Sequence, residues 1–460
     1  MLRGQIFINV SMMSAIRQLP AEVLALVFDA MLEDYDPFVR PTIAAGSIAR
    51  VCCAWSHVAR GMSHVWRYLC GGCEEECHDH SVSRLRATAK FAGCRLLRMR
   101  WSISATRGLW AVLVQYADRW DHLELTGSWV ELASLPILCL PRLRGIEVIL
   151  HGPASPCHFR ILEGAPLLQR LVVEALPPYG GSDDGRDEIV RSFPFFRRTS
   201  EIMLTHLALD LSIAPLLSAV KQLLFDCRSS LIRLALSGDV IWDCDLEGSG
   251  FIHMEVLQEM QLGWEACQLA RVTVAPRLHS LVMRNLVAED TDVGAEAHNA
   301  FKTVLGLFRD AQHAPKLRRL ELRQVDSAFP DAEGDFHRVA HWMTDLEELV
   351  IDNSDRSFRH LASFNGIISH LQCCNSAAPY FPSLISLTLM LGSCGASWVT
   401  HRLLWCVLHC RRRAHVCGSR SVAQLAYVMT DVRSGRGSSP PLTMEEVGNV
   451  SRCLQQIASA

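Results

Sequence analysis

Apolar residues recur along most of this chain in a short pattern that can be written L-x-x-L-x-L. The last two apolar positions of each copy alternate with polar residues, which is the period of a strand with one buried face. We therefore expect one short strand at each copy. The first positions of about ten copies are Trp120, Leu143, Leu168, Leu204, Leu231, Leu257, Leu278, Leu317, Leu346 and Leu384.

Most copies follow one another at roughly the 20 to 29 residues of a leucine-rich repeat. The runs between copies, such as 297–308 and 336–343, have the apolar spacing of helices. A strand with a return helix cannot bury its own apolar edge, but a stack of such units buries a continuous core. The pattern predicts an α/β fold: an irregular leucine-rich-repeat solenoid, with short parallel strands on its concave face and helices on its convex face.

A different pattern occupies residues 17–70, where apolar residues follow helical spacing. Leu24, Val27 and Phe28 share one helical face after Pro20, which suits a first helical turn. Residues 34–41 carry two prolines and separate this helix from a second one. The second helix has its apolar positions at Ile48, Val51, Cys52, Trp55, Val58 and Ala59. A unit this small buries little surface and gains stability by packing against something else.

The order of these residues resembles the F-box, and most closely the F-box-like domains of fungal proteins. The resemblance rests on Leu-Pro-x-Glu-Val-Leu-x-x-Val-Phe from Leu19, Arg-Val-Cys-x-x-Trp from Arg50 and Trp-x-x-Leu from Trp66. The insert at 33–42 departs from the family pattern. The resemblance implies docking to the Skp-type adaptor of a cullin ubiquitin ligase. The adaptor-binding residues that it implies are Leu19, Pro20, Val23, Leu24, Val27, Phe28, Val51 and Trp55.

Residues that flank the last two apolar positions of each copy point away from the predicted core. In the middle and late copies these positions carry arginines and acids, which are the predicted target-binding residues. Because guanidinium groups pair bidentately with carboxylate and phosphate oxygens, we expect Arg319 and Arg323 to favour an acidic or phosphorylated segment. An exposed strand face without a binding role is the alternative. The full set is Arg233, Arg284, Arg319, Glu321, Arg323, Glu348 and Asp352.

The amino-acid composition limits the kinds of partner that we expect for this chain. The formal net charge is −3 and no basic patch stands out, so we expect no nucleic acid. No stretch of eighteen apolar residues occurs, so we expect no membrane partner. The 18 cysteines are scattered through apolar runs of a 460-residue chain, which favours buried free thiols and a cytoplasmic or nuclear protein.

Motifs for catalysis are lacking. Neither G-x-x-x-x-G-K-[ST] nor G-x-S-x-G occurs, and no carboxylate pair stands apart from the surface charge. We therefore predict no catalytic residue, no cofactor and no enzyme activity. Cys70, Cys73, Cys77 and His80 are zinc-ligand types, but no second ligand pair follows at the usual distance. A solvated linker is the favoured interpretation of that stretch, with a metal site as the alternative.

The predicted organisation has five parts: an N-terminal tail at 1–16, an F-box-like domain at 17–70, a linker at 71–90, the solenoid at 91–432, and a C-terminal loop with a capping helix at 433–460. The expected function is that of a substrate receptor, which docks a Skp-type adaptor through the N-terminal helices and binds an unknown target protein on the solenoid. The alternative is a leucine-rich-repeat scaffold without a ligase, in which the N-terminal helices are only a cap.

Overall fold

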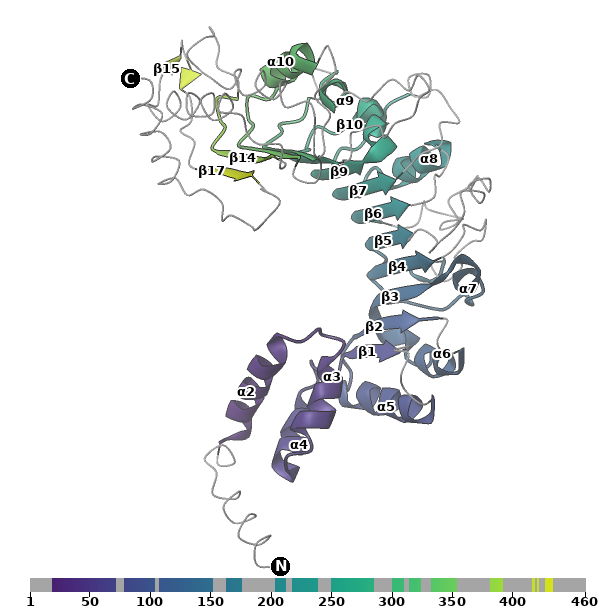
Figure 1. Cartoon of the computed structure of the whole chain (residues 1–460). Helices are drawn as coiled ribbons and strands as arrows, with labels where there is room; N and C mark the ends of the chain where they lie inside the picture. Colours follow the sequence, from purple (N-terminus) through teal and green to yellow (C-terminus); the bar gives the residue numbers. More distant parts are fainter. Residues whose placement is uncertain are drawn as a thin grey trace, which may run out of the picture. The chain divides into compact units, whose positions relative to one another are not determined.

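The computed structural model has a mixed α/β fold with parallel strands. Two compact units make up the chain, Met1–Leu204 and Thr205–Ala460. Figure 1 labels many of the helices and strands of both. The structure describes residues 19–71, 78–103, 107–151, 163–175, 203–211, 217–238, 250–284, 300–309, 314–323, 332–353, 381–391, 416–417, 420–421 and 427–432.

The first unit begins with short helices. They are α2 (Ala21–Glu33), α3 (Arg40–Ile43), a π-helical turn (Ala44–Ile48) and α4 (Cys53–Gly61). The predicted break between two helices is confirmed, and Pro41 lies in the first turn of α3. The predicted start of the second helix near Ile48 is wrong, because α4 begins at Cys53 after an extended Cys52. Gly46 and Ser47 weaken a regular helix just before this point.

The core of these helices is small and aromatic. Leu24, Phe28 and Leu32 form the buried stripe of α2. The ring of Phe28 meets the ring of Trp55 from α4 edge-on, with centroids 4.9 Å apart. Such pairs stabilise a fold beyond the area they bury. Trp66 follows α4, and its indole N–H donates to the carbonyl of Ala59 at 2.7 Å.

Among the described residues of the first unit, five parallel strands follow, and each is paired with the next. The strands β3, β4 and β5 confirm the first three copies of the apolar pattern, and two further strands precede them. The strands are β1 (Tyr68–Gly71), β2 (Leu97–Ser102), β3 (Trp120–Ser128), β4 (Gly145–His151) and β5 (Arg170–Ala175). The helical segments between them are α5 (His78–Phe91), α6 (Arg107–Val114), a 3₁₀ turn (Ala117–Arg119) and α7 (Trp129–Ala133).

Strand β1 ties the N-terminal helices to the sheet. Tyr68 to Cys70 belong to the predicted F-box-like domain and Gly71 begins the predicted linker, yet all four residues pair in parallel with β2. Gly71 lies opposite Trp101, and a Cβ atom at Gly71 would overlap the Trp101 ring. A glycine is therefore needed there, because the ring of Trp101 is fully buried. The helical segment and the first strands thus form one packed body.

In the described part of the second unit, eight parallel strands form the series, again each next to the preceding member. Seven of them lie at the predicted copies, and β17 is an additional one. They are β6 (His206–Leu211), β7 (Arg233–Gly238), β9 (Glu259–Gly263), β11 (Ser280–Arg284), β12 (Arg319–Arg323), β13 (Glu348–Asn353), β14 (Ser386–Leu391) and β17 (Tyr427–Val432). Two short pairs accompany them: β8 (Ile252–His253) with β10 (Thr273–Val274), and β15 (Val416–Cys417) with β16 (Arg420–Ser421).

Helices connect several of these strands. The predicted helices at 297–308 and 336–343 are confirmed with shifted ends, as α9 and α10. The helices are α8 (Leu217–Cys227), a 3₁₀ segment (Trp264–Val272), α9 (Ala300–Gly306) and α10 (Ala332–Trp342). Leu320 and Leu322 show the burial pattern, since both are buried while Arg319 and Arg323 on the same strand face the other way. The predicted C-terminal loop and capping helix lie outside the described residues.

Candidate functional site

Helix α2 has an apolar face that the described part of the chain does not cover. Val23, Leu26 and Met31 are 39%, 69% and 50% exposed. They share one side of the helix with the half-buried Val27, because positions i, i+3, i+4 and i+8 lie close together around a helix. Several adjacent exposed aliphatic side chains on one helix are typical of a protein-binding surface. We call Val23, Leu26, Val27 and Met31 the α2 face.

The predicted adaptor-binding residues divide into two groups. Leu24, Phe28 and Trp55 are buried inside the helical segment, where they form its core. Pro20, Val23 and Val51 are exposed, and Leu19 and Val27 are half-buried. Their role in adaptor binding stays a prediction, but the buried members are inaccessible in the chain as it stands.

Sequence reasoning missed Leu26 and Met31, although the helical spacing from Val23 contains both. Two further exposed apolar residues, Tyr35 and Val39, lie in the turn that follows α2. The resemblance named above points instead to Leu24 and Phe28, which are buried. The exposure of individual side chains depends on how α2 packs on α4, which the sequence pattern does not specify.

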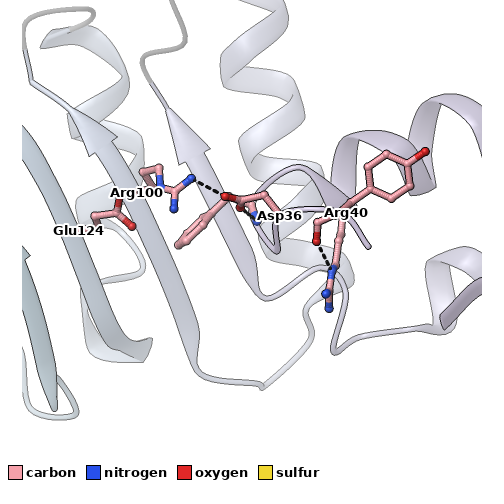
Figure 2. Close-up of polar contacts among 6 residues, drawn as sticks. Asp36, Arg40, Arg100 and Glu124 are labelled. Atoms are coloured by element: carbon pink, nitrogen blue, oxygen red, sulfur yellow. Dashed lines mark hydrogen bonds and ion pairs between the residues drawn. The ribbon is translucent and has the colours of Figure 1, made fainter. Parts of the chain in front are cut away.

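The turn after α2 is held on the sheet by Arg100 of β2, as Figure 2 shows. The Arg100 Nη1 atom lies 3.0 Å from Asp36 Oδ2, and its Nε donates to Glu124 Oε1 of β3 at 2.7 Å. The guanidinium also lies over the Phe38 ring, 4.3 Å from its centroid. One cation therefore makes two ion pairs and a cation–π contact. This arrangement fixes residues 34–39 against the first strands.

The charges at this junction support each other. Burial alone would raise the pKa of Asp36, but hydrogen bonds from the Phe38 N–H and from Arg100 outweigh it and lower that pKa. Burial would likewise lower the pKa of Arg100, yet its bonds to Glu124 and Asp36 raise it. Both groups are therefore held in their charged forms.

The polar face of β12 carries three charged residues in alternation. Arg319 Nη2 lies 2.9 Å from Glu321 Oε2, and Arg323 Nε bonds the other carboxylate oxygen of Glu321. A second carboxylate, Glu348 of β13, lies 3.4 Å from Arg319 Nη1. On β7, Arg233 Nε is 3.1 Å from Glu259 of β9. Most of the predicted target-binding residues are therefore neutralised by one another.

Arg284 is the exception among these residues. It ends β11, and in the strand register it pairs with Arg323 of β12. Its Nε is buried without a hydrogen-bond partner in the residues that the structure describes. Burial lowers the pKa of Arg284, and the neighbouring charge of Arg323 lowers it further. Two cations thus lie side by side, and the negative charges of Glu321, Asp210 and Asp352 partly offset the effect of Arg323 on Arg284.

A second polar strand face lies in the first unit, where sequence reasoning proposed no residues. In register across β2, β3 and β4 are Arg100, Glu124 and Glu147. Burial raises the pKa of Glu147, and the negative charges of Glu124 and Glu174 raise it further. The sequence does carry a signal for them. Glu124 and Glu147 each stand between the last two apolar positions of a copy, and Arg100 lies between two apolar residues in the same alternation.

The described residues hold no group of three or more His, Cys, Asp or Glu side chains placed to bind a metal ion. Of the zinc-ligand types named above, Cys73 and Cys77 lie outside the residues that the structure describes. Burial raises the pKa of the Cys227 and Cys267 thiols to about 12, so both are protonated and unreactive near neutral pH. No described helix is long and apolar enough to cross a membrane.

Comparison with protein-family models and with curated proteins found no match to this chain.

Proposed function

We propose that this protein is the substrate-receptor subunit of a cullin-type ubiquitin ligase. Residues 17–70 act as an F-box-like domain that docks a Skp-type adaptor, and the strand series acts as an irregular leucine-rich-repeat solenoid that binds a target protein. Catalysis belongs to partner subunits in this arrangement. The F-box resemblance of Leu19 to Leu69 supplies the role, and the parallel order of the strands supports the solenoid.

The α2 face is the observation that carries the proposal. An isolated amphipathic helix on a small domain buries one stripe, and α2 does so through Leu24, Phe28 and Leu32. Its second apolar stripe faces outward at Val23, Leu26 and Met31. Helix-in-groove recognition uses such a stripe as its set of anchors. An adaptor groove that covers the α2 face would remove these side chains from water.

The test is co-purification of the full chain with a Skp-type adaptor. Leu26→Asp places an unpaired charge in the proposed interface, and a buried unpaired charge costs about 2–5 kcal/mol of binding. We expect adaptor recovery to fall by more than about tenfold. Leu24→Asp is a poor test, because Leu24 is 3% exposed and the substitution would unfold the helices themselves.

Val130→Asp is the matched control. Val130 is 65% exposed on helix α7, so the same chemical change there leaves the α2 face intact. Adaptor recovery with Val130→Asp should equal that of the wild type, and circular dichroism should show the same helix content for both variants. Equal recovery with Leu26→Asp would contradict docking through α2. Absence of adaptor from the wild-type preparation would contradict the ligase role.

A protein-interaction scaffold without a ligase is the second candidate function, and the structure offers an observation in its favour. Strand β1 joins the helical segment to the sheet, and Arg100 holds the turn after α2 on β2 and β3. A terminal cap for a strand stack needs such attachments. In that case the target protein would still co-purify while the adaptor would not.

A further inference from the structure

The turn that follows α4 meets the segment before β2 through a polar contact at the surface of the first unit. Arg95 Nε donates a hydrogen bond to the Ser63 hydroxyl oxygen at 2.5 Å. Arg95 is exposed and Ser63 is half-buried. The backbone of Arg95 is held in turn, because the Arg119 guanidinium donates to the Arg95 carbonyl from two nitrogens, at 3.0 and 3.3 Å. The Ser63 hydroxyl therefore faces a cation that the fold keeps in place.

Positive charge lies around this hydroxyl without a matching acid. Three arginines belong to this part of the chain, and none of them makes an ion pair with another described residue. They are Arg60, Arg95 and Arg119. The carboxylate of Asp29 on α2 does reach the same turn, but it already bonds the ring of His64 at 2.6 Å. An anion at Ser63 would therefore be attracted by guanidinium groups.

Several other hydroxyl groups of the described residues have different surroundings. The side chains of Ser134, Ser230 and Ser237 donate to carbonyl or carboxylate oxygens, which would repel a phosphate group. Thr42 of α3 does accept a hydrogen bond from Arg84 of α5, but that contact is partly buried. Ser63 combines an accessible hydroxyl with an arginine placed to receive an anion.

We infer that Ser63 is a phosphorylation site and that the phosphoryl group formed there pairs with Arg95. A protein kinase transfers the γ-phosphoryl group of ATP to the Ser63 oxygen, ADP is released, and the hydroxyl proton passes to the catalytic base of the kinase. The product carries close to two negative charges and three acceptor oxygens. Because Arg95 already directs its guanidinium at the Ser63 oxygen, its Nη atoms can bind the new oxygens as a bidentate pair.

The modification strengthens the junction between the N-terminal helices and the strands. Ser63 follows α4 and Arg95 precedes β2, so a charge-assisted pair between them joins the two parts. The unmodified contact joins a neutral hydroxyl to an exposed arginine and contributes less. This inference goes beyond the proposed ligase role and does not depend on it, since neither of its measurements uses the adaptor.

The first measurement locates the phosphate. The full chain is incubated with ATP and a purified arginine-directed serine kinase, and the phosphorylated residues are identified by mass spectrometry. We expect phosphate at Ser63, and at least about fivefold less of it in Arg60→Gln, because charge near the acceptor guides the choice of substrate by kinases. Absence of phosphate from Ser63 would overturn the assignment of the acceptor.

The second measurement tests the pairing with Arg95. Phosphoserine is incorporated at position 63 of the full chain, and hydrogen exchange is followed at the amide of Val65, which donates to the Met62 carbonyl within this turn. We expect exchange at least about fivefold slower than in the unmodified chain. Phosphoserine should give no such slowing in Arg95→Gln. Arg95→Lys should keep part of the slowing, because the charge remains but the bidentate fork is lost.

Phosphoserine at position 134 is the matched control. Ser134 is exposed, and its hydroxyl donates to the Glu131 carbonyl rather than facing an arginine. The Val65 amide should then exchange at the unmodified rate, and circular dichroism should show the same helix content in every variant. Equal slowing of Val65 exchange in the wild type and in Arg95→Gln would overturn the pairing. Unchanged or faster exchange in the wild type with phosphoserine at position 63 would overturn the strengthened junction.

Discussion

Glu321 is a buried charge on the polar side of a strand. Its side chain is only 4% exposed, because Arg319 and Arg323 extend over it from the same strand. Side chains two residues apart on a strand point to the same face, so the sequence Arg-x-Glu-x-Arg places the acid between two bases. The acid in turn holds Arg323 in position beside Arg284.

Glu321→Gln should therefore destabilise the protein measurably. The amide keeps the shape but loses the charge, and hydrogen bonds to charged groups contribute about 1.5–3 kcal/mol each before solvent screening of the arginines. We expect a loss of about 1–3 kcal/mol in the free energy of unfolding by urea at pH 7. Glu347→Gln is the control, because its pair with Arg318 is exposed and should contribute less than about 0.5 kcal/mol. Equal losses in the two variants would contradict the buried triad.

The pH dependence of that effect has a definite sign. Burial would raise the pKa of Glu321, but hydrogen bonds from Arg319 and Arg323 outweigh it, and the pKa lies below its ordinary value. A carboxyl group with a lowered pKa in the folded state contributes its full stability above the unfolded pKa, about 4.3 for Glu. This contribution is lost as the pH falls through the folded pKa. The difference between wild type and Glu321→Gln should thus shrink below about pH 4.

At the scale of elements, the first unit depends on a contact between distant parts of the sequence. Arg100 and Asp36 are 64 positions apart, and their ion pair holds the turn after α2 on β2. The amides of Val39 and Arg40 donate to the carbonyl of Asp36, so the order of this turn depends on Asp36. Helix α3 begins at Arg40, directly after the turn.

Arg100→Gln should loosen this turn. It removes two ion pairs and a cation–π contact, which together contribute roughly 1–2 kcal/mol at a partly exposed site. Hydrogen exchange of the Val39 and Arg40 amides should become at least about fivefold faster. Arg86→Gln, an exposed change on α5, should leave both amides unaffected. Unchanged protection in Arg100→Gln would show that the turn is held by its own backbone bonds.

These elements also show what the sequence could predict. Apolar and polar residues alternate at each L-x-x-L-x-L copy, which predicts a strand with one buried face. Each copy is a strand in the structure. Helix α2 was predictable from Pro20 and from the spacing of Leu24 and Phe28. The start of α4 was not predictable. The helical spacing of apolar residues continues through Val51 and Cys52, but the backbone at Cys52 is extended. Tertiary packing there overrides a weak local preference.

For the whole molecule, the binding surfaces were less predictable than the fold. The periodic spacing of apolar residues identifies the faces of a helix or strand, but it does not show which face another element covers. Leu24 and Leu26 are both apolar residues of α2, and only their packing separates a core residue from an exposed one. Similarly, Arg284 and Arg319 occupy equivalent strand faces. Their difference comes from neighbouring strands, which place Glu348 beside Arg319 and Arg323 beside Arg284.

The parallel strands in the second unit make a sharp prediction about the two faces of β11. Leu281 is fully buried on the apolar face, and Val282 beside it is half-buried on the polar face. Leu281→Asn places an amide in the core and should cost about 2–5 kcal/mol of unfolding free energy, whereas Val282→Asn should cost less than about 1 kcal/mol. In a strand stack the damage spreads to neighbouring elements.

Thiol labelling reports that spread. Cys227 and Cys267 are buried in the second unit, and burial raises the pKa of both thiols to about 12, so they react only when the structure opens. Opening becomes more frequent as stability falls, and we expect Leu281→Asn to speed the labelling of both thiols by more than about tenfold. Val282→Asn should label at the wild-type rate. Equal labelling rates in Leu281→Asn and Val282→Asn would contradict the assignment of Leu281 to the buried face of β11. They would also contradict the placement of Arg284 on the other face of that strand.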